Sequence, residues 1–564
     1  MQRLGRGDYL ALLLLVVAGL WVCRDFPHAY WRVDDPQILL HAVNTPLADA
    51  FTSPAAWQKL TINNLTPWIT ASFKFDLLLA GTEPSFFYFH QLLSTLAAIV
   101  LGFFLARHYL PTALALGAVF ICVVGPSSTA VIEALMTRHY LEGLSLSLLS
   151  ILAARRAILS GSFPFAILGG AFYAMACTAK EIYVPLVVVL PALALLWIKR
   201  PPWIFFVPWL AVAALYIPWR AVMLGSLLGG YSADALQGNV AGGINWQFVG
   251  EALVTLGGIP KSLLGSHGLA IVLAFGLAGL VLVPATSSEQ RRRWLLLVFV
   301  LSVSSLVPLI PLASYFGELP VNRFLFLPWV VFCAVFPVAV HRVALAIKSR
   351  GPRVYPVDLA TAALVASAGI FALQRGEFSR AVRSDNAAMF DVVGRFLSSG
   401  KVSDALLAPP PMLEVWHYVL GICQLNALRG LQCPRTVITG LAIPAQLAAL
   451  YRYDPAQRSM VDATHDLSSI EKEQSGIDRS SALSVEVTLG EASAHWRLGP
   501  YPDGQYFFVS QAIGVIPVPA VSQRRVRIDQ IEFQVHHRSA SGHLIASPDL
   551  VAASGQTLKW FRTP

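Results

Sequence analysis

Residues 8–44 read DYLALLLLVVAGLWVCRDFPHAYWRVDDPQILLHAVN, and the organisation of the whole chain follows from this stretch. Residues 8–23 are apolar and come close to the length of about 20 residues that a helix needs to cross a bilayer. No small-residue cleavage site follows them, so we expect a retained membrane anchor and not a signal peptide. Two adjacent acids, Asp34 and Asp35, follow the anchor and are therefore expected at a membrane surface.

The composition indicates a membrane protein. Of the 564 residues, 55% are hydrophobic and only 13% are charged, whereas a soluble domain has about 25% charged residues. The formal net charge of +9 could suggest a nucleic-acid partner. The basic residues, however, lie in short runs between apolar segments, which is the pattern that sets membrane orientation. We therefore expect a lipid bilayer as the surroundings and no nucleic acid.

The apolar segments predict the fold class, an α-helical polytopic membrane protein with about eleven transmembrane helices. They lie at 8–23, 86–106, 111–126, 139–154, 163–179, 182–198, 203–219, 268–285, 294–313, 322–340 and 355–373. Each is near the length that a bilayer requires.

The basic residues between these segments predict the orientation. Six clusters fall on the same side of the membrane: Arg3 and Arg6, Arg107, Arg155–Arg156, Lys199–Arg200, Arg291–Arg293, and the cluster within Arg342–Arg353. Because basic loops stay cytoplasmic, the N-terminus is expected in the cytoplasm and the C-terminal part outside. A bacterial inner membrane with a periplasmic or extracellular C-terminal domain fits the composition, although a protein of the endoplasmic reticulum would look similar.

Two domains are expected, a transmembrane domain at 1–373 and a soluble extracytoplasmic domain at 374–564. The outer loop 24–85 has apolar residues at helical spacing and predicts helices lying along the membrane. The outer loop 220–267 is rich in glycine and is either a mobile cover over a site or a plain connector.

The C-terminal domain is expected to be mixed α/β. Helical patterns lie at 380–397 and 444–451, and alternating patterns predict strands at 483–489, 506–509 and 525–535, the last with a bulge near Gln530. Cys423 and Cys433 share this polar region, so a disulfide could form between them if the region is exported. The six cysteines form no CxxC motif, and no zinc site is indicated.

Charged residues of both signs gather at the predicted outer ends of the spans. They are Asp34, Asp35, His90, Glu133, Arg138, His139, Lys180, Glu181, Arg220, Glu318 and Arg323. Ionisable residues beside a membrane span are costly and usually functional. Paired acids could deprotonate an acceptor hydroxyl, and arginine and lysine could bind a phosphate and stabilise its developing charge.

Simpler interpretations of the same residues exist. An Asp pair can cap the helix that begins at Pro36, and Lys180 with Glu181 can be a neutral surface pair. His139 and Glu133 could each satisfy a neighbouring group. A proton relay could also use these residue types.

Four motifs together resemble the GT-C superfamily of membrane glycosyltransferases. They are VDDPQILLHAVNTPL, FFYFHQLLS, CTAKEIYVPLVVVLP and VNRFLFLPWVVF, and they span most of residues 1–340. The members to which they are most similar are protein O-mannosyltransferase-like, including the tetratricopeptide-linked transmembrane O-mannosyltransferases. The chain departs from them at Thr66–Pro67–Trp68, which lacks the family's arginine, and at Asn322, which replaces a glutamate. No tetratricopeptide repeats follow.

This resemblance implies an inverting transfer of a sugar from a polyprenyl-phosphate donor to an acceptor hydroxyl on the outer face. It implies Asp34 as the general base, with Asp35 orienting it or contacting the acceptor. The donor phosphate would be bound by Lys180, Arg138 and Arg323, with support from His90, Glu181, Glu133, His139 and Arg220. Some relatives use a divalent metal at the acidic pair, but an isolated acid pair does not make a metal site, and no cofactor is assigned.

Other functions stay open. A polymerase or ligase of undecaprenyl-diphosphate-linked glycans would also use outer-face arginines, but would favour a large outer loop between late spans. A transporter of lipid-linked sugars would show internal repeats and charges at mid-membrane, neither of which the sequence shows. An inactive relative that serves as an assembly subunit is a further alternative. The donor sugar and the acceptor (a lipid, a glycan or a protein) are not readable.

Overall fold

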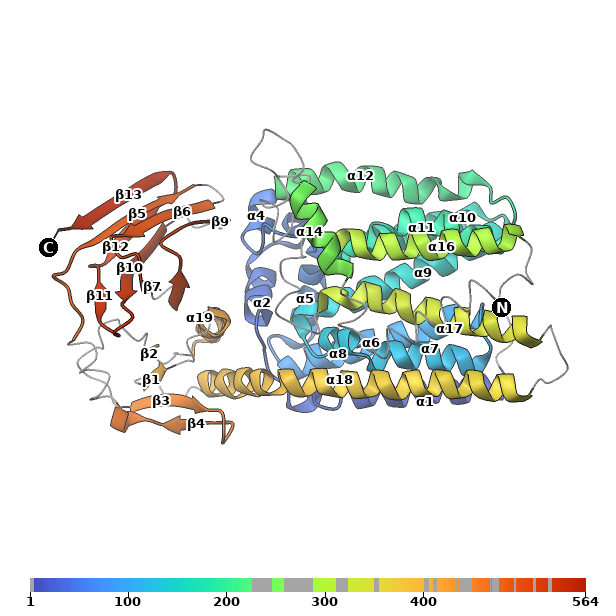
Figure 1. The fold of residues 1–564 in the computed structure, drawn as a ribbon, viewed down its shortest axis with the longest axis horizontal. Helices are drawn as coiled ribbons and strands as arrows, with labels where there is room; N and C mark the ends of the chain where they lie inside the picture. Colours follow the sequence, from blue (N-terminus) through green and yellow to red (C-terminus); the bar gives the residue numbers. More distant parts are fainter. Residues whose placement is uncertain are drawn as a thin grey trace. The chain divides into compact units, whose positions relative to one another are not determined.

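A computed structural model describes most of the chain (Figure 1). It covers residues 5–225, 246–257, 288–310, 323–348, 355–399, 405–408, 413–431, 435–436, 449–466, 468, 476–490, 493–510, 514–525 and 530–563. The chain divides into two compact units. The first contains residues 1–29, 46–57 and 63–383, and the second contains residues 30–45, 58–62 and 384–564.

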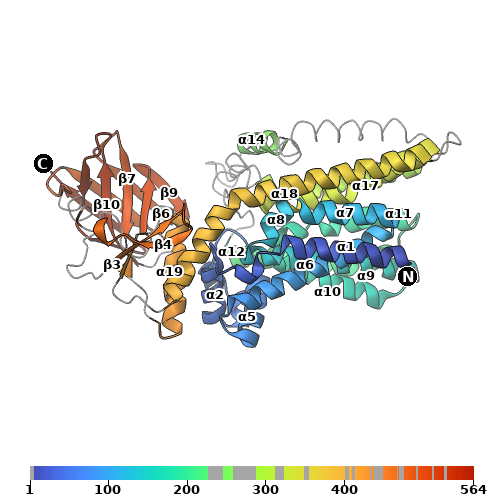
Figure 2. The same ribbon diagram turned by 90° about the horizontal axis from the view of Figure 1, so that it is seen from below.

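The first unit is a bundle of long apolar helices that run side by side (Figures 1 and 2). Its longer helices are α1 (Arg6–Val22), α6 (Pro84–Arg107), α7 (Thr112–Val124), α9 (Arg138–Ser160), α10 (Phe163–Ala179), α11 (Leu186–Trp197), α12 (Val207–Leu224), α14 (Trp246–Gly257), α16 (Ser288–Leu306), α17 (Phe326–Lys348) and α18 (Tyr355–Ser398). Among the described residues, seven helices are long and apolar enough to cross a membrane, or eight if α7 and the short α8 (Pro126–Ile132) form one bent span. The predicted class, a helical polytopic membrane protein with a C-terminal domain that contains sheets, is confirmed.

Most predicted spans coincide with helices. Segment 268–285 and most of loop 220–267 lie outside the described residues, and so does Glu318. The segments predicted at 355–373 and 380–397 form one continuous 44-residue helix, α18, which contributes residues to both units. The predicted domain boundary at 373/374 therefore falls inside a helix.

One span is bent by 61° between α7 and α8. Gly125 and Pro126 lie at the bend, and proline cannot donate the backbone hydrogen bond that would continue the first helix. A Cβ atom on Gly125 would lie only 2.2 Å from the ring of Trp329 on α17. The Trp329 indole Nε1 donates to the carbonyl of Cys122 at 3.0 Å. The glycine thus lets α17 approach the bend closely.

The predicted helices of loop 24–85 are confirmed. They are α2 (Asp35–Asn44) in the second unit and α3 (Leu47–Thr52), α4 (Pro54–Gln58) and α5 (Pro67–Ala80) in the first. The helix α5 packs against α6, α9 and α10. Short 3₁₀ turns η2 (Leu135–Thr137), η3 (Glu181–Tyr183) and η7 (Arg323–Leu325) lead into α9, α11 and α17.

The second unit contains α2, α19 (Leu413–Leu428) and three sheets. The strands are β1 (Ala405–Ala408), β2 (Arg435–Thr436), β3 (Ala449–Asp454), β4 (Ser459–Asp462), β5 (Leu483–Leu489), β6 (Ser493–Gly499), β7 (Gln505–Ser510), β8 (Gly514–Val518), β9 (Val521–Arg525), β10 (Gln530–Arg538), β11 (Leu544–Ala546), β12 (Leu550–Ala553) and β13 (Gln556–Arg562). Two sheets are antiparallel, β13-β5-β6-β9 and β11-β10-β7-β8, with β12 also on β10. The third has the order β2-β1-β3-β4. Cys423 on α19 is disulfide-bonded.

Apolar residues of the two antiparallel sheets form one core. In β5, every second residue from Leu483 to Leu489 is buried, and these side chains join Trp496 of β6 and Phe533 of β10 in one cluster. This alternation is what a sheet with one buried face requires.

The segment 525–535, predicted as one strand with a bulge near Gln530, lies partly outside the described residues, because residues 526–529 are not described. Arg525 ends β9, which pairs with β6, and Gln530 begins β10, which pairs with β7 and β12. The helix predicted at 444–451 is wrong for residues 449–451, which begin strand β3, and its first five residues lie outside the described ranges. This pattern is too short for periodicity to separate a helix from a strand.

A buried histidine in β10 predicts an acid-sensitive second unit. His536 is 2% exposed, its Nε2 lies 2.8 Å from Oε1 of Gln534, and burial lowers its pKa to about 4 from an ordinary value of 6.5. The unfolded chain binds a proton at this histidine more readily than the folded chain does. The contribution of the neutral His536 to the free energy of unfolding is therefore fully present above about pH 6.5 and is lost as the pH falls towards 4. The expected loss is up to about 3 kcal/mol.

Hydrogen exchange of the β10 amides in the full-length protein, measured between pH 7 and pH 4, tests this prediction. His536→Gln is expected to flatten the part of the pH dependence that the histidine contributes. An identical pH dependence in the wild type and the variant would contradict it.

Candidate active site

The acidic pair begins helix α2. Asp34 is exposed, and its side chain makes no capping hydrogen bond to the helix. Asp35 is 0% exposed, and its Oδ2 accepts a hydrogen bond of 2.8 Å from the backbone amide of Arg32. The two carboxylates therefore have different surroundings: Asp34 is accessible, and Asp35 is held in the turn. The helix-capping interpretation is not supported for Asp34.

The turn before the pair is strained and clamped. Val33 has φ of 47°, a left-handed conformation that is unfavourable for a β-branched residue. The Asp391 carboxylate holds the turn, because it accepts from the backbone amide of Tyr30 at 2.9 Å and from Nε and Nη2 of Arg32 at 2.8 and 2.7 Å. Strain that persists in a clamped turn is common at functional sites.

In the first unit, Lys180 lies where helix α10 ends. It adopts an extended conformation at the C-cap, and its Nζ lies 4.9 Å from the ring centroid of Tyr140 on α9. The Tyr183 hydroxyl donates to the Tyr140 carbonyl at 2.5 Å, which joins the turn after Lys180 to the start of α9. A cation over an aromatic face is stabilised electrostatically.

Arg323 begins the turn η7 that leads into α17. Its Nη1 lies 3.8 Å from the Met136 sulfur, and its guanidinium lies over the ring of Phe324. His139, in the first turn of α9, is 6% exposed. The structure thus brings Lys180 and Arg323 to the start of α9, where they contact Tyr140 and Met136 on either side of His139 in the sequence.

Glu181 and Arg220 form an ion pair beside this group. Arg220 Nε and Nη2 donate to the two Glu181 oxygens at 2.8 and 3.2 Å, and the backbone amide of Leu65 donates to Oε1 at 2.9 Å. Glu181 therefore connects the turn after Lys180 to α12 and to the segment before α5. The alternative of a neutral Lys180–Glu181 surface pair does not describe these contacts.

Arg138 lies in a buried polar network between α5, α6 and α9. Its guanidinium is 0% exposed, pairs with Asp76, which is also 0% exposed, and donates to the Phe87 carbonyl at 2.6 Å. His90 bridges two acids, with Nδ1 2.6 Å from Asp76 Oδ1 and Nε2 3.3 Å from Glu142 Oε1. The Arg138 guanidinium is therefore fully buried and ion-paired in this structure.

Sequence reasoning missed Asp76 and Glu142. Trp68 and Ser72 donate to the two Glu142 oxygens at 2.9 and 2.8 Å. Trp68, Ser72 and Asp76 are spaced four residues apart on α5, as Arg138 and Glu142 are on α9, so each set lies on one helix face. Polar residues at this spacing in apolar helices are the feature from which the sequence could have predicted this network.

Glu133, at the end of α8, connects helices, and its ion-pair partners are on a different helix from the one that Lys180 contacts. Its two oxygens pair with Nε of Arg380 at 2.7 Å and Nη2 of Arg383 at 2.8 Å, both on α18. Arg24 at the end of α1 pairs with Glu377 on α18 at 2.8 Å. These pairs connect α18 to α1 and to the end of α8, so Glu133 is assigned a bracing role.

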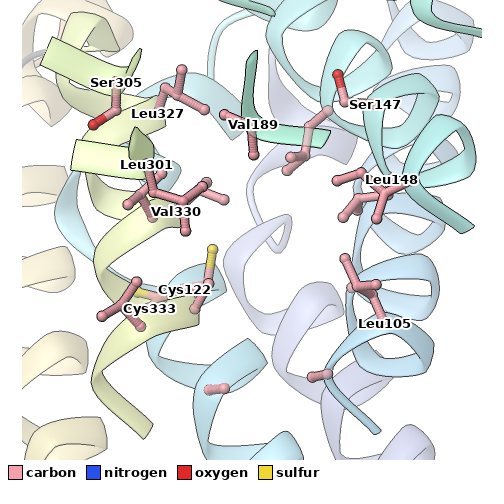
Figure 3. A pocket seen from close by; sticks show the side chains of 18 of the residues that line it. Leu105, Cys122, Ser147, Leu148, Val189, Leu301, Ser305, Leu327, Val330 and Cys333 are labelled. Carbon is pink, nitrogen blue, oxygen red and sulfur yellow. The ribbon is translucent and has the colours of Figure 1, made fainter. Parts of the chain in front are cut away.

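An apolar cavity of about 290 Å³ lies inside the bundle. Leu105 and Leu148 lie on one side of it and Leu301, Val330 and Cys333 on the other (Figure 3). Its lining includes residues two to four positions after the two cations, Ile182 and Tyr183 after Lys180 and Phe326 and Leu327 after Arg323. A hydrocarbon chain could therefore lie beneath a group bound by these cations.

Within the described ranges, no three His, Cys, Asp or Glu side chains form a group that could hold a metal ion. One Asp35 oxygen already accepts a backbone hydrogen bond. The acidic turn alone does not offer the six or more oxygen ligands that Ca²⁺ or Mg²⁺ takes.

No protein-family model matches the chain, and no curated protein matches it. The structure is similar to three solved structures, each 13% identical to it. An oligosaccharyltransferase from Archaeoglobus fulgidus has a TM-score of 0.44, with 76% of this chain and 64% of that chain covered. ArnT from Cupriavidus metallidurans, bound to undecaprenyl phosphate, has a TM-score of 0.40, with 80% and 94% covered. The arabinosyltransferase EmbB from Mycobacterium smegmatis has a TM-score of 0.31, with 100% and 62% covered.

Two of these three proteins are named as sugar transferases, and none is named as a mannosyltransferase.

Proposed function

We propose that the protein transfers a sugar from a polyprenyl-phosphate donor to an acceptor hydroxyl on the outer face of the membrane. The observation that carries this proposal is the apolar cavity, whose lining includes Ile182, two residues after Lys180, and Phe326, three residues after Arg323. A polyprenyl phosphate has a long hydrocarbon chain and a single anionic group, which matches an apolar cavity with cations at its end.

In this proposal, Lys180 and Arg323 bind the donor phosphate. Arginine can contact phosphate oxygens in pairs, and lysine acts as a compact point charge. Fixed cations stabilise the charge that develops on the departing phosphate more strongly than water does, because they need no reorganisation during the reaction. The Glu181–Arg220 ion pair would hold the turn that carries Lys180. In this proposal Arg138 acts as a positioning residue, because its guanidinium is buried and paired with Asp76, and Glu133 supports the bundle through its pair with Arg380.

The proposed reaction is a single displacement at the anomeric carbon. The acceptor oxygen forms a bond to this carbon, and the bond from the carbon to the phosphate oxygen breaks on the opposite side. Polyprenyl phosphate leaves with the electron pair, and the acceptor proton passes to Asp34. Inversion of the anomeric configuration follows from attack opposite the leaving group.

Asp34 is the better base of the acidic pair. Its carboxylate is exposed, whereas Asp35 is buried and accepts the Arg32 amide. In this proposal, Asp35 and Asp391 hold the turn that carries Asp34 in position. The acceptor is a lipid, a glycan or a protein, and the sugar is a hexose or a pentose.

Lys180→Met is expected to lower sugar transfer by a factor of about 10² to 10³, the usual loss when one group that stabilises developing charge is removed. The effect should fall mainly on kcat, because the charge that Lys180 meets grows as the phosphate leaves. The assay is release of polyprenyl phosphate by the purified full-length protein, measured by mass spectrometry with a panel of polyprenyl-phosphate sugars.

Lys59→Met is the matched control, since Lys59 is an exposed lysine that lies outside the proposed site. It should retain full activity. If Lys180→Met retains full activity with every donor that the wild type uses, Lys180 has no part in the reaction.

A further inference from the structure

A second hollow lies toward the other end of the bundle. It has a volume of about 520 Å³ and includes Arg155 of α9, which is 17 residues along this helix from Arg138. At 1.5 Å per residue, this separation is about 25 Å. Four cations from different segments line the hollow: Arg155, Lys199, Arg293 and Arg342. The hollow is therefore distinct from the Lys180–Arg323 group.

The hollow carries an excess of positive charge. Its lining contains one carboxylate, Glu289, which pairs with Arg293 one helical turn away. Arg155 and Arg342 are half-buried, and neither makes an ion pair with an acid in the described part of the chain. Arg342 lies 5.0 Å from the ring centroid of Trp294. Half-buried guanidinium groups without a carboxylate are costly, so a bound anion would stabilise the folded protein.

This cationic hollow adjoins the apolar cavity. Tyr109, Leu196 and Trp294 line both. A small soluble anion would use only the charged part. A molecule with an anionic headgroup and a hydrocarbon chain would use both, with the chain passing Trp294 into the apolar cavity. The lining therefore favours an amphiphilic ligand.

We propose that the hollow of Arg155, Lys199, Arg293 and Arg342 binds the phosphate headgroup of an anionic phospholipid, with an acyl chain in the adjoining end of the apolar cavity. The alternative is that these residues serve only to orient the chain in the membrane. An orientation signal requires basic residues on one side but no shared hollow. The proposal does not depend on sugar transfer.

Lipid binding by the full-length protein tests the proposal. The protein is purified in a neutral detergent and titrated with dioleoyl phosphatidylglycerol, and bound lipid is counted by native mass spectrometry. Dioleoyl phosphatidylcholine is the zwitterionic comparison, and inorganic phosphate is the soluble competitor. We expect phosphatidylglycerol to be retained in preference to phosphatidylcholine, and millimolar phosphate to leave it bound.

Arg155→Gln and Arg342→Gln are each expected to weaken phosphatidylglycerol binding about fivefold, the effect of one basic residue near an anionic lipid surface. Lys199→Gln tests the same hollow through an exposed residue, whose substitution should not disturb folding. Arg156→Gln is the control, because Arg156 is exposed and does not line the hollow.

Equal binding by Arg156→Gln and the three hollow variants would overturn the proposal. Equal retention of the two lipids would overturn it as well, and so would displacement of the lipid by inorganic phosphate.

Discussion

Asp34→Asn is expected to lower the rate of sugar transfer by a factor of about 10² to 10⁴, the usual contribution of a positioned general base. The amide has nearly the same shape but cannot take the acceptor proton. Donor binding and folding should persist, because the exposed Asp34 side chain makes no capping hydrogen bond. The measurement is polyprenyl-phosphate release at saturating donor, together with donor binding and thermal stability of the same protein.

Asp503→Asn is the matched control, since Asp503 is another exposed acid of the second unit. It should retain full activity. Unchanged turnover in Asp34→Asn would remove this carboxylate from the mechanism, and loss of turnover together with loss of folding would make the carboxylate structural.

Arg138→Met is expected to destabilise the protein by about 3–5 kcal/mol, the usual cost of removing one partner from a buried ion pair. Arg138 and Asp76 are both 0% exposed, so the substitution leaves the Asp76 carboxylate inside the bundle without its guanidinium partner and with the His90 ring as its remaining contact. The loss should appear as a lower midpoint of thermal unfolding in detergent. Lost activity in this variant would follow from the lost fold.

The double variant Arg138→Met/Asp76→Asn separates charge pairing from packing. Removing both charges should recover part of the stability, because no unpaired charge then stays buried. If the double variant loses the sum of the two single losses, the residues do not interact. If Arg138→Met is as stable as the wild type and binds donor more weakly, Arg138 is a phosphate ligand after all.

Hydropathy alone predicted the helical bundle because each span is a long apolar segment. The continuity of α18 across the predicted boundary at 373/374 could not be predicted in the same way. The sequence becomes polar after Gln374, but α18 continues through this region, where Glu377, Arg380 and Arg383 pair with Arg24 and Glu133. These partners lie more than 200 residues away in the chain, so local composition does not reveal them.

The sequence predicts on which side of the bundle the candidate site residues lie. Helix direction alternates along the chain, so the ends that carry His90, Arg138, Lys180, Arg220 and Arg323 can be assigned to one side from the sequence. How deeply each side chain is buried cannot be assigned from the sequence in this way. Arg138 is buried with Asp76 while Lys180 lies over Tyr140, and this difference depends on how α5, α6 and α9 pack.

The apolar cavity was not predicted, because it is formed by the spacing of helices and not by any one segment. The strands predicted at 483–489 and 506–509 are confirmed as β5 (Leu483–Leu489) and β7 (Gln505–Ser510), and in β5 every second residue is buried, as the alternating pattern predicts. Their pairing partners, such as β13 for β5 and β10 for β7, could not be predicted, because pairing joins segments that are distant in the sequence.

The most direct test of the account is the identity of the lipid product. Purified protein in lipid is incubated with polyprenyl-phosphate sugars, with polyprenyl-diphosphate glycans and with a mixture of acceptors, and the released lipid is identified by mass spectrometry. We expect the wild type to release polyprenyl monophosphate in equal amount to the glycosylated acceptor, and Asp34→Asn to release it at a rate lower by a factor of about 10² to 10⁴. Release of polyprenyl diphosphate, or movement of donor across the membrane without cleavage of its sugar, would contradict it.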